Sequence, residues 1–147
     1  MTTNLSSART RIKICGLTRE QDVDAAVQAG ADAVGFVLYG GSPRGISVAR
    51  AAELATRLSP FVTPVLLFVN AGAPEIIAAC TAVVRATVQF HGDETPADVA
   101  ALQDRGCTVI KALQVRDRDS LSQIGHFPCE TILLDAYNPG LYGGSGE

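Results

Sequence analysis

Residues 11–38 read RIKICGLTREQDVDAAVQAGADAVGFVL, and this stretch decides the fold prediction. The β-branched run Arg11–Cys15 predicts a strand. The Ala-rich segment Arg19–Ala29 has helical periodicity and stops at Gly30, a typical helix end. A second apolar run, Ala33–Leu38, predicts another strand. Strand, helix and strand in such close succession indicate a βαβ unit, in which the two strands run parallel.

The same alternation continues along the rest of the chain. Further strands are predicted at Thr63–Val69, Thr87–His91, Val109–Val115 and Thr131–Tyr137. Further helices are predicted at Val48–Leu58, Pro74–Val84, Pro96–Arg105 and Asp117–Ile124. Ser47 and Thr95 are the predicted N-caps of two of these helices, and Pro74 suits a first helical turn. The alternation as a whole indicates a parallel sheet covered by helices.

Two α/β architectures fit this order: a doubly wound open sheet, and part of a (β/α)8 TIM barrel. A doubly wound nucleotide-binding domain predicts a GxGxxG turn after its first strand, which Cys15–Arg19 does not supply. A complete barrel usually needs at least about 200 residues, whereas the chain has 147. We therefore predict an incomplete TIM barrel of about six βα units, as one domain over residues 11–147. Residues 1–10 are predicted to form a flexible leader.

The glycine-rich segment Asn138–Glu147 follows the last predicted strand without another helix. Parallel sheets bury both faces, so this ending predicts truncation after the sixth strand. A loose C-terminal tail is the alternative. The run Gly143–Gly146 is weak evidence for phosphate binding, and a mobile loop is an equally good interpretation.

The composition predicts an enzyme or a small-molecule binder with a substantial core. Hydrophobic residues make up 47% and charged residues 18%, which argues against disorder. The net charge of −3, the 5% of aromatic residues and the lack of a Lys/Arg run argue against a nucleic-acid partner. The sequence has no apolar run of about 18 residues, so no membrane-spanning helix is predicted. No Walker A motif or metal-ligand spacing occurs, so neither a cofactor nor a metal is expected.

The four cysteines are Cys15, Cys80, Cys107 and Cys129. Their spacing forms no CxxC pattern, and a chain of this length needs no disulfide to fold. We therefore expect reduced thiols and a cytoplasmic location.

Polar side chains gather near the carboxyl ends of four predicted strands. Because side chains alternate between the faces of a strand, each of these strands has one apolar face and one face with polar groups. The polar set is Lys13, Cys15, Gln89, His91, Lys111 and Asp135. If these faces point into a barrel, the set converges on one cavity, at the end of the sheet where α/β proteins bind ligands. Buried ion pairs of Lys13 or Lys111 with Asp135 are the alternative.

Two members of this set suit proton transfer. The charge of Lys13 would favour the thiolate of Cys15, and partial desolvation would favour the protonated form of Asp135. A thiolate base and a carboxylic acid across one cavity make a general acid/base pair. An inert buried Cys15 and a capping or ion-paired Asp135 are the alternatives.

Two further residues have both a functional and a structural interpretation. Arg44 lies in a long loop after the second predicted strand and could bind a carboxylate or phosphate in bidentate fashion. It could equally be a solvated surface arginine. His91 could line the cavity, or it could be tied to the acidic residues Asp93 and Glu94 that follow it.

A series of short motifs, taken in order, resembles the phosphoribosylanthranilate isomerase family. The motifs are Lys13–Thr18, Gly30–Phe36, Ser42–Arg44 with Ile46–Ser47, Leu67–Asn70, Val88–Glu94, Ile110–Ala112, Leu133–Asp135 and Tyr142–Gly146. Each motif is short, but the ordered set is specific and the resemblance covers Ile12–Glu147.

The resemblance implies a (β/α)8 barrel and an isomerase of tryptophan biosynthesis. The reaction is the Amadori rearrangement of N-(5-phospho-ribosyl)anthranilate to 1-(2-carboxyphenylamino)-1-deoxyribulose 5-phosphate. In this resemblance Asp135 matches the general acid, Cys15 the general base, and Arg44 the residue that binds the anthranilate carboxylate. The remaining substrate-binding positions are Lys13, Gln89, His91, Gly144 and Gly146. No cofactor or metal is implied.

The chain departs from the family after the last glycine-rich motif. Members of the family continue into a helix and two further βα units, whose loops hold most of the phosphate-binding amides. We therefore expect weak or no activity from the 147 residues alone, and self-association through the open first and last strands. A degenerate barrel fragment that binds a phosphosugar or a partner without turnover is the alternative. An isomerase that also serves histidine synthesis remains a second alternative.

Overall fold

The computed structural model describes residues 9–140 and 142 of the chain. In this part of the chain, six parallel strands pair strictly in sequence order. They are β1 (Lys13–Cys15), β2 (Ala33–Val37), β3 (Thr63–Phe68), β4 (Thr87–Phe90), β5 (Val109–Val115) and β6 (Thr131–Ala136). A doubly wound sheet would change direction within its strand order, so the observed order is that of a barrel.

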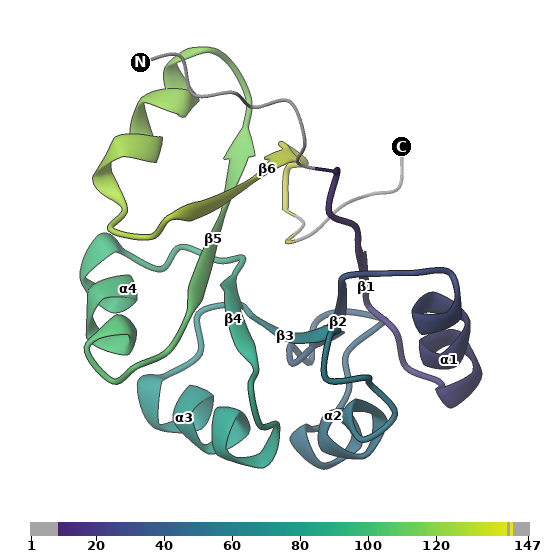
Figure 1. The fold of residues 1–147 in the computed structure, drawn as a ribbon. Helices are drawn as coiled ribbons and strands as arrows, with labels where there is room; N and C mark the ends of the chain where they lie inside the picture. The colour runs from purple at the N-terminus through teal and green to yellow at the C-terminus, as the bar shows by residue number, and fades with distance from the viewer. Residues whose placement is uncertain (1–8, 141, 143–147) are drawn as a thin grey trace, which may run out of the picture.

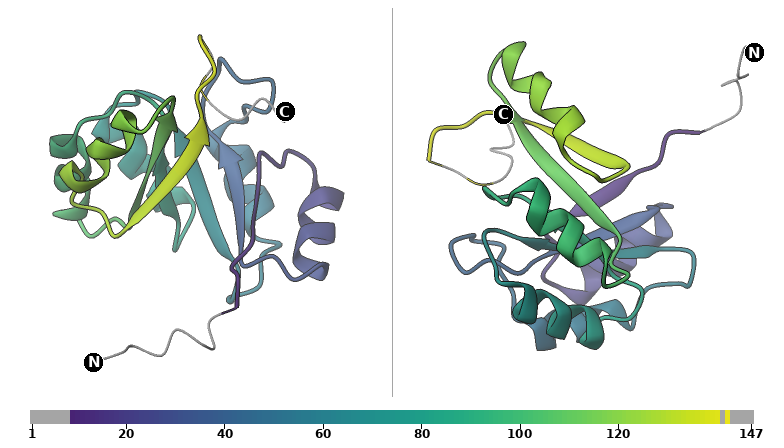
Figure 2. Two further views of the ribbon diagram at one scale, coloured as in Figure 1. Left: turned by 90° about the horizontal axis from the view of Figure 1, so that it is seen from above. Right: turned by 90° about the vertical axis from the view of Figure 1, so that its left-hand side faces the viewer.

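The helices lie on the outer side of the curved sheet, which is open between β6 and β1 (Figure 1). They are α1 (Glu20–Gln28), α2 (Val48–Ala55), α3 (Ala73–Ala82) and α4 (Pro96–Gln103). Two further views show the same curved sheet with helices around its outside (Figure 2). The prediction of an incomplete (β/α)8 barrel is confirmed for the described residues. None of their helices is long and apolar enough to cross a membrane.

The predicted helix starts are confirmed by the cap geometry. The Ser47 hydroxyl accepts a hydrogen bond from the backbone N–H of Arg50. Thr95 and Asp98 form a capping box, in which each side chain accepts from the backbone N–H of the other residue. Pro74 lies in the first turn of α3. These local signals place α2, α3 and α4 correctly because a cap satisfies N–H groups that the helix itself leaves unpaired.

The fifth predicted helix is not an α-helix. The segment Asp119–His126 forms a 3-10 helix, η1, and none of its residues is buried. Its apolar residues Leu121 and Ile124 remain exposed, so no packed face favours the α-helical geometry. At its start the Ser120 hydroxyl accepts from the N–H groups of Arg116 and Asp117, which fixes a tight local turn.

The main core lies between the sheet and the outer helices. The strands contribute alternate residues to it, which leaves the intervening residues on the inner face of the sheet. The strand residues in this core are Val34, Phe36, Leu66, Phe68, Val88, Phe90 and Val109. Helix residues that complete it include Val23, Leu54, Ile76, Val99 and Leu102.

Asp32 fastens the start of the described chain to the beginning of β2. Its carboxylate accepts hydrogen bonds from the guanidinium of Arg9 and, at 2.9 Å, from the backbone N–H of Ile12. These contacts lower the pKa of Asp32 to about 2, with the Arg9 bond as the larger cause. Arg9 falls within the predicted leader, whose residues 1–8 lie outside the described part of the chain.

We predict that Asp32→Asn destabilises the protein at neutral pH and much less in acid. The folded-state pKa is lower than the ordinary aspartate value of about 4. The stability that Asp32 contributes is therefore fully present above that value and is lost as the pH falls toward about 2. Urea unfolding of both proteins between pH 7 and pH 2 measures the difference. Glu130→Gln, at an exposed carboxylate, is the control, and a difference that stays constant with pH would contradict the prediction.

Candidate functional site

A series of hydrogen bonds crosses the inner face of the sheet from one edge strand to the other. The Lys13 ammonium on β1 donates to Oε1 of Gln89 on β4. Gln89 Nε2 lies 3.0 Å from His91 Nδ1, and His91 Nε2 lies 2.9 Å from Asp135 Oδ2 on β6. Because β1 and β6 are not neighbours in the sheet, these contacts bring together residues that the strand pairing alone leaves apart.

The alternation of side chains along β4 places Gln89 and His91 in this position. Val88 and Phe90 belong to the core under the helices, so the residues between and after them face inward. Gln89 is 1% and His91 7% exposed, and buried polar groups of this kind need hydrogen-bond partners. Among the described residues, no buried side-chain nitrogen or oxygen lacks a partner.

Cys15 and Arg44 lie together at the end of β1. Arg44 Nη1 donates to the carbonyl oxygen of Cys15 at 3.2 Å, and the Arg44 side chain lies against Gly16. On the neighbouring strand, a Cβ added to Gly35 would lie 2.5 Å from Cys15 Sγ, so only glycine leaves room for the thiol. The loop that carries Arg44 is therefore folded back onto the residue predicted as the general base.

Lys111 does not hydrogen-bond with the inner set, and the prediction that it lies on the same face of the sheet as that set is wrong. The register aligns Lys111 with Phe90, which packs under the helices, so Lys111 lies on the outer face of β5. Its ammonium donates to Glu94 Oε2 at 2.8 Å and to the carbonyl of Gly92 at 2.6 Å. The alternative ion pairs with Asp135 do not form either, since Lys13 contacts Gln89 and Lys111 contacts Glu94.

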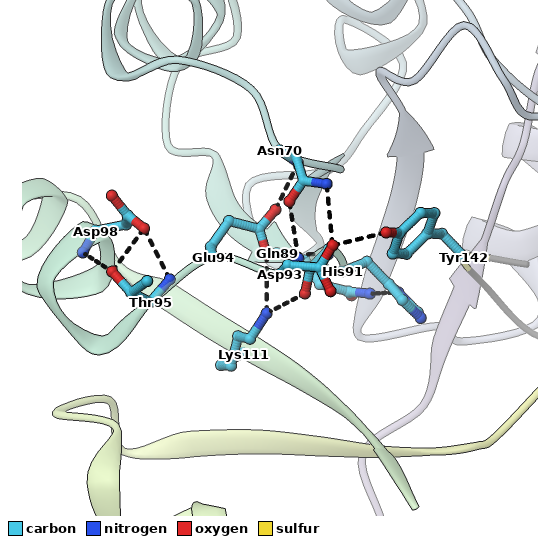
Figure 3. Close-up of polar contacts among 10 residues, drawn as sticks. Asn70, Gln89, His91, Asp93, Glu94, Thr95, Asp98, Lys111 and Tyr142 are labelled. Carbon is cyan, nitrogen blue, oxygen red and sulfur yellow. Dashed lines mark hydrogen bonds and ion pairs between the residues drawn. The ribbon is translucent and has the colours of Figure 1, made fainter. Parts of the chain in front are cut away.

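The loop after β4 is held by a buried carboxylate that sequence reasoning missed (Figure 3). Besides Lys111, Glu94 accepts hydrogen bonds from the backbone N–H groups of Asn70 and Gly92, at 2.8 and 2.9 Å. This loop starts directly after His91, so its anchoring fixes the end of β4. His91 itself contacts Gln89 and Asp135 rather than the acidic residues that follow it. The signal for Glu94 was its position in the sequence HGDE, but the motif gave no partner.

Tyr142 closes the same end of the sheet. Its hydroxyl donates to Asp93 Oδ2 at 2.7 Å, which raises the pKa of the phenol (Figure 3). Its ring meets that of Tyr39 edge to face, with centroids 6.3 Å apart. Of the predicted site residues, Gly144 and Gly146 lie beyond it and outside the described residues.

A cavity of about 640 Å³ opens at the carboxyl ends of β4 and β5. Its walls include His91, Asp93, Lys111, Gln114 and Tyr142. This volume lies in the range of small-molecule sites, but neither Cys15 nor Asp135 lines the cavity, which lies beside η1 and the loop after β4. Within the described part of the chain, no cluster of three or more metal-ligating side chains occurs.

The fold and the site together define a class of protein. The chain is part of a parallel α/β barrel that carries buried polar side chains on its inner face and a cavity at the carboxyl ends of its strands. Residues 12–147 match the family model of N-(5'-phosphoribosyl)anthranilate (PRA) isomerase, and the chain belongs to this family.

Individual relatives agree with this assignment. The chain is 57% identical, over 95% of its length, to N-(5'-phosphoribosyl)anthranilate isomerase of Methylibium petroleiphilum. It is 50% identical, over 97% of its length, to the enzyme of the same name from Leptothrix cholodnii. The chain spans 64% of the length of each of these relatives.

Solved structures of the family have the same fold. The phosphoribosyl anthranilate isomerase of Thermotoga maritima superposes with a TM-score of 0.84 at 36% identity, covering 95% of this chain and 67% of that one. A second structure of such an isomerase holds reduced 1-(o-carboxyphenylamino)-1-deoxyribulose 5-phosphate. It superposes with a TM-score of 0.80 at 37% identity, covering 88% of this chain and 66% of that one.

We predict that Glu94→Gln lowers the free energy of unfolding by about 3–5 kcal/mol, the cost of breaking a buried ion pair. The change would leave the ammonium of Lys111, which is 2% exposed, without its charged partner. Glu53→Gln is the matched control, because Glu53 pairs with Arg50 on the surface, where such pairs contribute at most about 1 kcal/mol. Denaturant unfolding measures both variants, and equal losses would contradict the prediction.

Proposed function

We propose that the protein to which this chain belongs isomerises N-(5-phosphoribosyl)anthranilate to 1-(2-carboxyphenylamino)-1-deoxyribulose 5-phosphate. The observation that carries the proposal is the hydrogen-bonded path from Lys13 to Asp135, which starts two residues from Cys15 on the same face of β1. The names of the relatives support the reaction, and the product analogue bound to one of them supports the substrate class.

In the first step, Asp135 donates a proton to the ring oxygen of the ribose. The bond between this oxygen and C1 breaks, and the lone pair of the anthranilate nitrogen forms a C1–N double bond. The product is an open-chain, positively charged Schiff base. His91 holds the carboxyl group of Asp135 at 2.9 Å, which keeps it oriented for this transfer.

In the second step, the thiolate of Cys15 removes the proton from C2. The electrons of the C–H bond form a C1–C2 double bond, and the electrons of the C–N double bond return to nitrogen. The resulting enol becomes the ketone when the C2 hydroxyl loses its proton and C1 gains one. No external oxidant or reductant is needed.

Arg44 is proposed to bind the carboxylate of anthranilate. One of its N–H groups contacts the Cys15 carbonyl, while the exposed guanidinium has further donors for a bidentate contact. That placement would bring the aromatic part of the substrate next to Cys15. Lys13, Gln89 and His91 are proposed as the inner wall of the site, and Gly144 and Gly146 as donors to the phosphate.

We predict that Asp135→Asn and Cys15→Ser each lower kcat by about 10²–10⁴-fold, the usual contribution of a general acid or base. Substrate binding should change little, because both replacements keep the size of the side chain. Steady-state fluorescence assays of the purified full-length gene product measure kcat and KM. Asp104→Asn and Cys129→Ser are the controls, because they make the same chemical changes away from the proposed site. The proposal requires that these two control variants keep the kcat of the unmodified protein.

The alternative of a binding protein without turnover has a different outcome in the same assay. It predicts ligand binding in the unmodified protein with no product, and no effect of the Asp135 and Cys15 variants on that binding. A second substrate from histidine synthesis would show as turnover of the corresponding phosphoribosyl compound by the same two residues. Cytoplasmic location stays a prediction.

Sequencing the gene beyond the codon for Glu147 defines the protein to be assayed, since the chain spans 64% of the length of the two relatives named above. If two more βα units follow, the proposed activity belongs to the longer polypeptide. If a stop codon follows, we predict weak or no turnover, because binding energy at a remote phosphate supports catalysis at the reacting centre.

We also propose that β1 and β6 accept further strands, from the same polypeptide or from a second copy. Within the described residues both strands pair on one side only, and Ile14 and Leu134 on their outer faces are exposed. Open strand edges with apolar residues favour association.

We predict that the 147-residue chain by itself sediments as more than a monomer, and that Leu134→Lys shifts it toward the monomer. The added charge would oppose pairing at the β6 edge. Val84→Lys, at an exposed apolar residue outside the strands, is the control. A folded, soluble monomer of the unmodified chain in sedimentation velocity would contradict the proposal.

A further inference from the structure

We propose that the hydrogen bonds from Lys13 to Asp135 run in one fixed direction, which holds His91 as the neutral tautomer protonated at Nε2. In the same arrangement, Oδ1 of Asp135 is the carboxyl oxygen that carries the transferable proton. The tautomer follows from the hydrogen bonds alone. The consequence for Asp135 rests on the proposed isomerase function.

The direction is set at Lys13. An ammonium group has three donors and no acceptor. The atom of Gln89 that faces it must therefore be the amide oxygen, as found in the contact between Lys13 Nζ and Gln89 Oε1. The amide nitrogen of Gln89 is then turned toward His91, at 3.0 Å from Nδ1.

The orientation of the Gln89 amide determines which nitrogen of the His91 imidazole carries the hydrogen. Because an amide NH2 group only donates, His91 Nδ1 must accept and carries no proton. A neutral imidazole with a bare Nδ1 has its hydrogen on Nε2. That N–H lies 2.9 Å from Asp135 Oδ2 and donates to it.

Burial prevents the reverse arrangement. Gln89 and His91 are almost fully enclosed, so water cannot replace a lost partner. Rotating the amide by half a turn would place its NH2 group against the ammonium of Lys13. Protonating His91 at Nδ1 would place an N–H against the same NH2 group. Each change leaves two donors facing each other, and in both cases the buried amide of Gln89 loses its acceptor.

The charged groups around His91 come from several elements. Asp135 on β6 contacts it directly, and Lys13 on β1 acts on it through Gln89. Asp93 and Lys111 line the same cavity as His91, but their side chains bond elsewhere, to Asn70 and Tyr142 and to Glu94, respectively. The direct partners that fix the tautomer are therefore Gln89 and Asp135.

With this tautomer of His91, the two carboxyl oxygens of Asp135 have different roles. Oδ2 accepts from His91 whether or not the carboxyl group is protonated, as the carbonyl oxygen of an acid does. The backbone N–H of Ala136 lies 3.0 Å from Oδ1 and occupies one of its two lone pairs. The other lone pair of Oδ1 remains for the proton. Lys13, Gln89 and His91 are thus positioning residues, which act on the reaction through Asp135.

The test is ¹⁵N NMR of the full-length protein labelled in its histidines, recorded at neutral pH without substrate. The resonances of His91 are those missing from the spectrum of His91→Asn, and His126, exposed on η1, serves as the internal reference. We expect Nδ1 of His91 in the range of an unprotonated nitrogen and Nε2 in that of a protonated one. A protonated Nδ1 would overturn the proposal.

Two variants test the direction of the hydrogen bonds, one by reversing it and one by removing the group that sets it. In Gln89→Glu a carboxylate faces Nδ1 and can only accept, so the Nδ1 resonance should move into the protonated range. Lys13→Met removes the group that orients the amide, and a mixture of both tautomers is expected. Gln28→Glu is the control, because it makes the same replacement of glutamine by glutamate at an exposed position on α1, away from His91. If the His91 spectrum is unchanged in both variants, the proposal is wrong.

The spectra and the isomerase assay separate this inference from the proposed function. We expect Gln89→Glu to reduce kcat and shift the pH profile with a smaller change in KM, since Asp135 would lose its oriented donor. The expected spectra together with an inactive parent protein would support the tautomer and refute the isomerase function. An active parent with Nδ1 of His91 protonated would refute the tautomer and leave the function standing.

Discussion

Alternation of side chains along β4 is the constraint on which both the core and the candidate site depend. Val88 and Phe90 pack beneath the helices, while Gln89 and His91 face the interior of the curved sheet. A shift of one residue in this strand would bury two apolar side chains in the polar interior and place two polar ones in the core. The hydrophobic packing of the outer layer therefore also holds the inner hydrogen bonds in place. Stability and chemistry are specified by opposite faces of the same short strand.

The local part of this arrangement could be predicted from the sequence. Strand runs, glycine stops and the caps at Ser47 and Thr95 depend on neighbouring residues, and they placed the elements to within a few residues. The spacing of strands and helices indicated a parallel sheet but fitted both a doubly wound sheet and a barrel, and the missing GxGxxG turn and the family resemblance favoured the barrel. The 3-10 geometry of η1 could not be foreseen, because it depends on the absence of a packing partner for Leu121 and Ile124 rather than on their pattern.

The site was predictable in its membership but not in its contacts. Parity within each strand placed Lys13 with Cys15 and Gln89 with His91, and both pairs lie as expected. Parity says nothing about the register between strands, and this is why Lys111 was assigned to the wrong face. Glu94 was missed for a similar reason, since its partners Asn70, Gly92 and Lys111 come from three separate segments. Membership of the isomerase family is consistent with these contacts.

The ion pair between Lys111 and Glu94 has a consequence for how such a protein can change over time. It fastens the loop after β4 from the helix side of the sheet, without using any residue of the inner face. Side chains on the inner face can therefore be replaced while the loop keeps its anchor. A change in the side chains of the inner face therefore does not require the frame around them to be rebuilt.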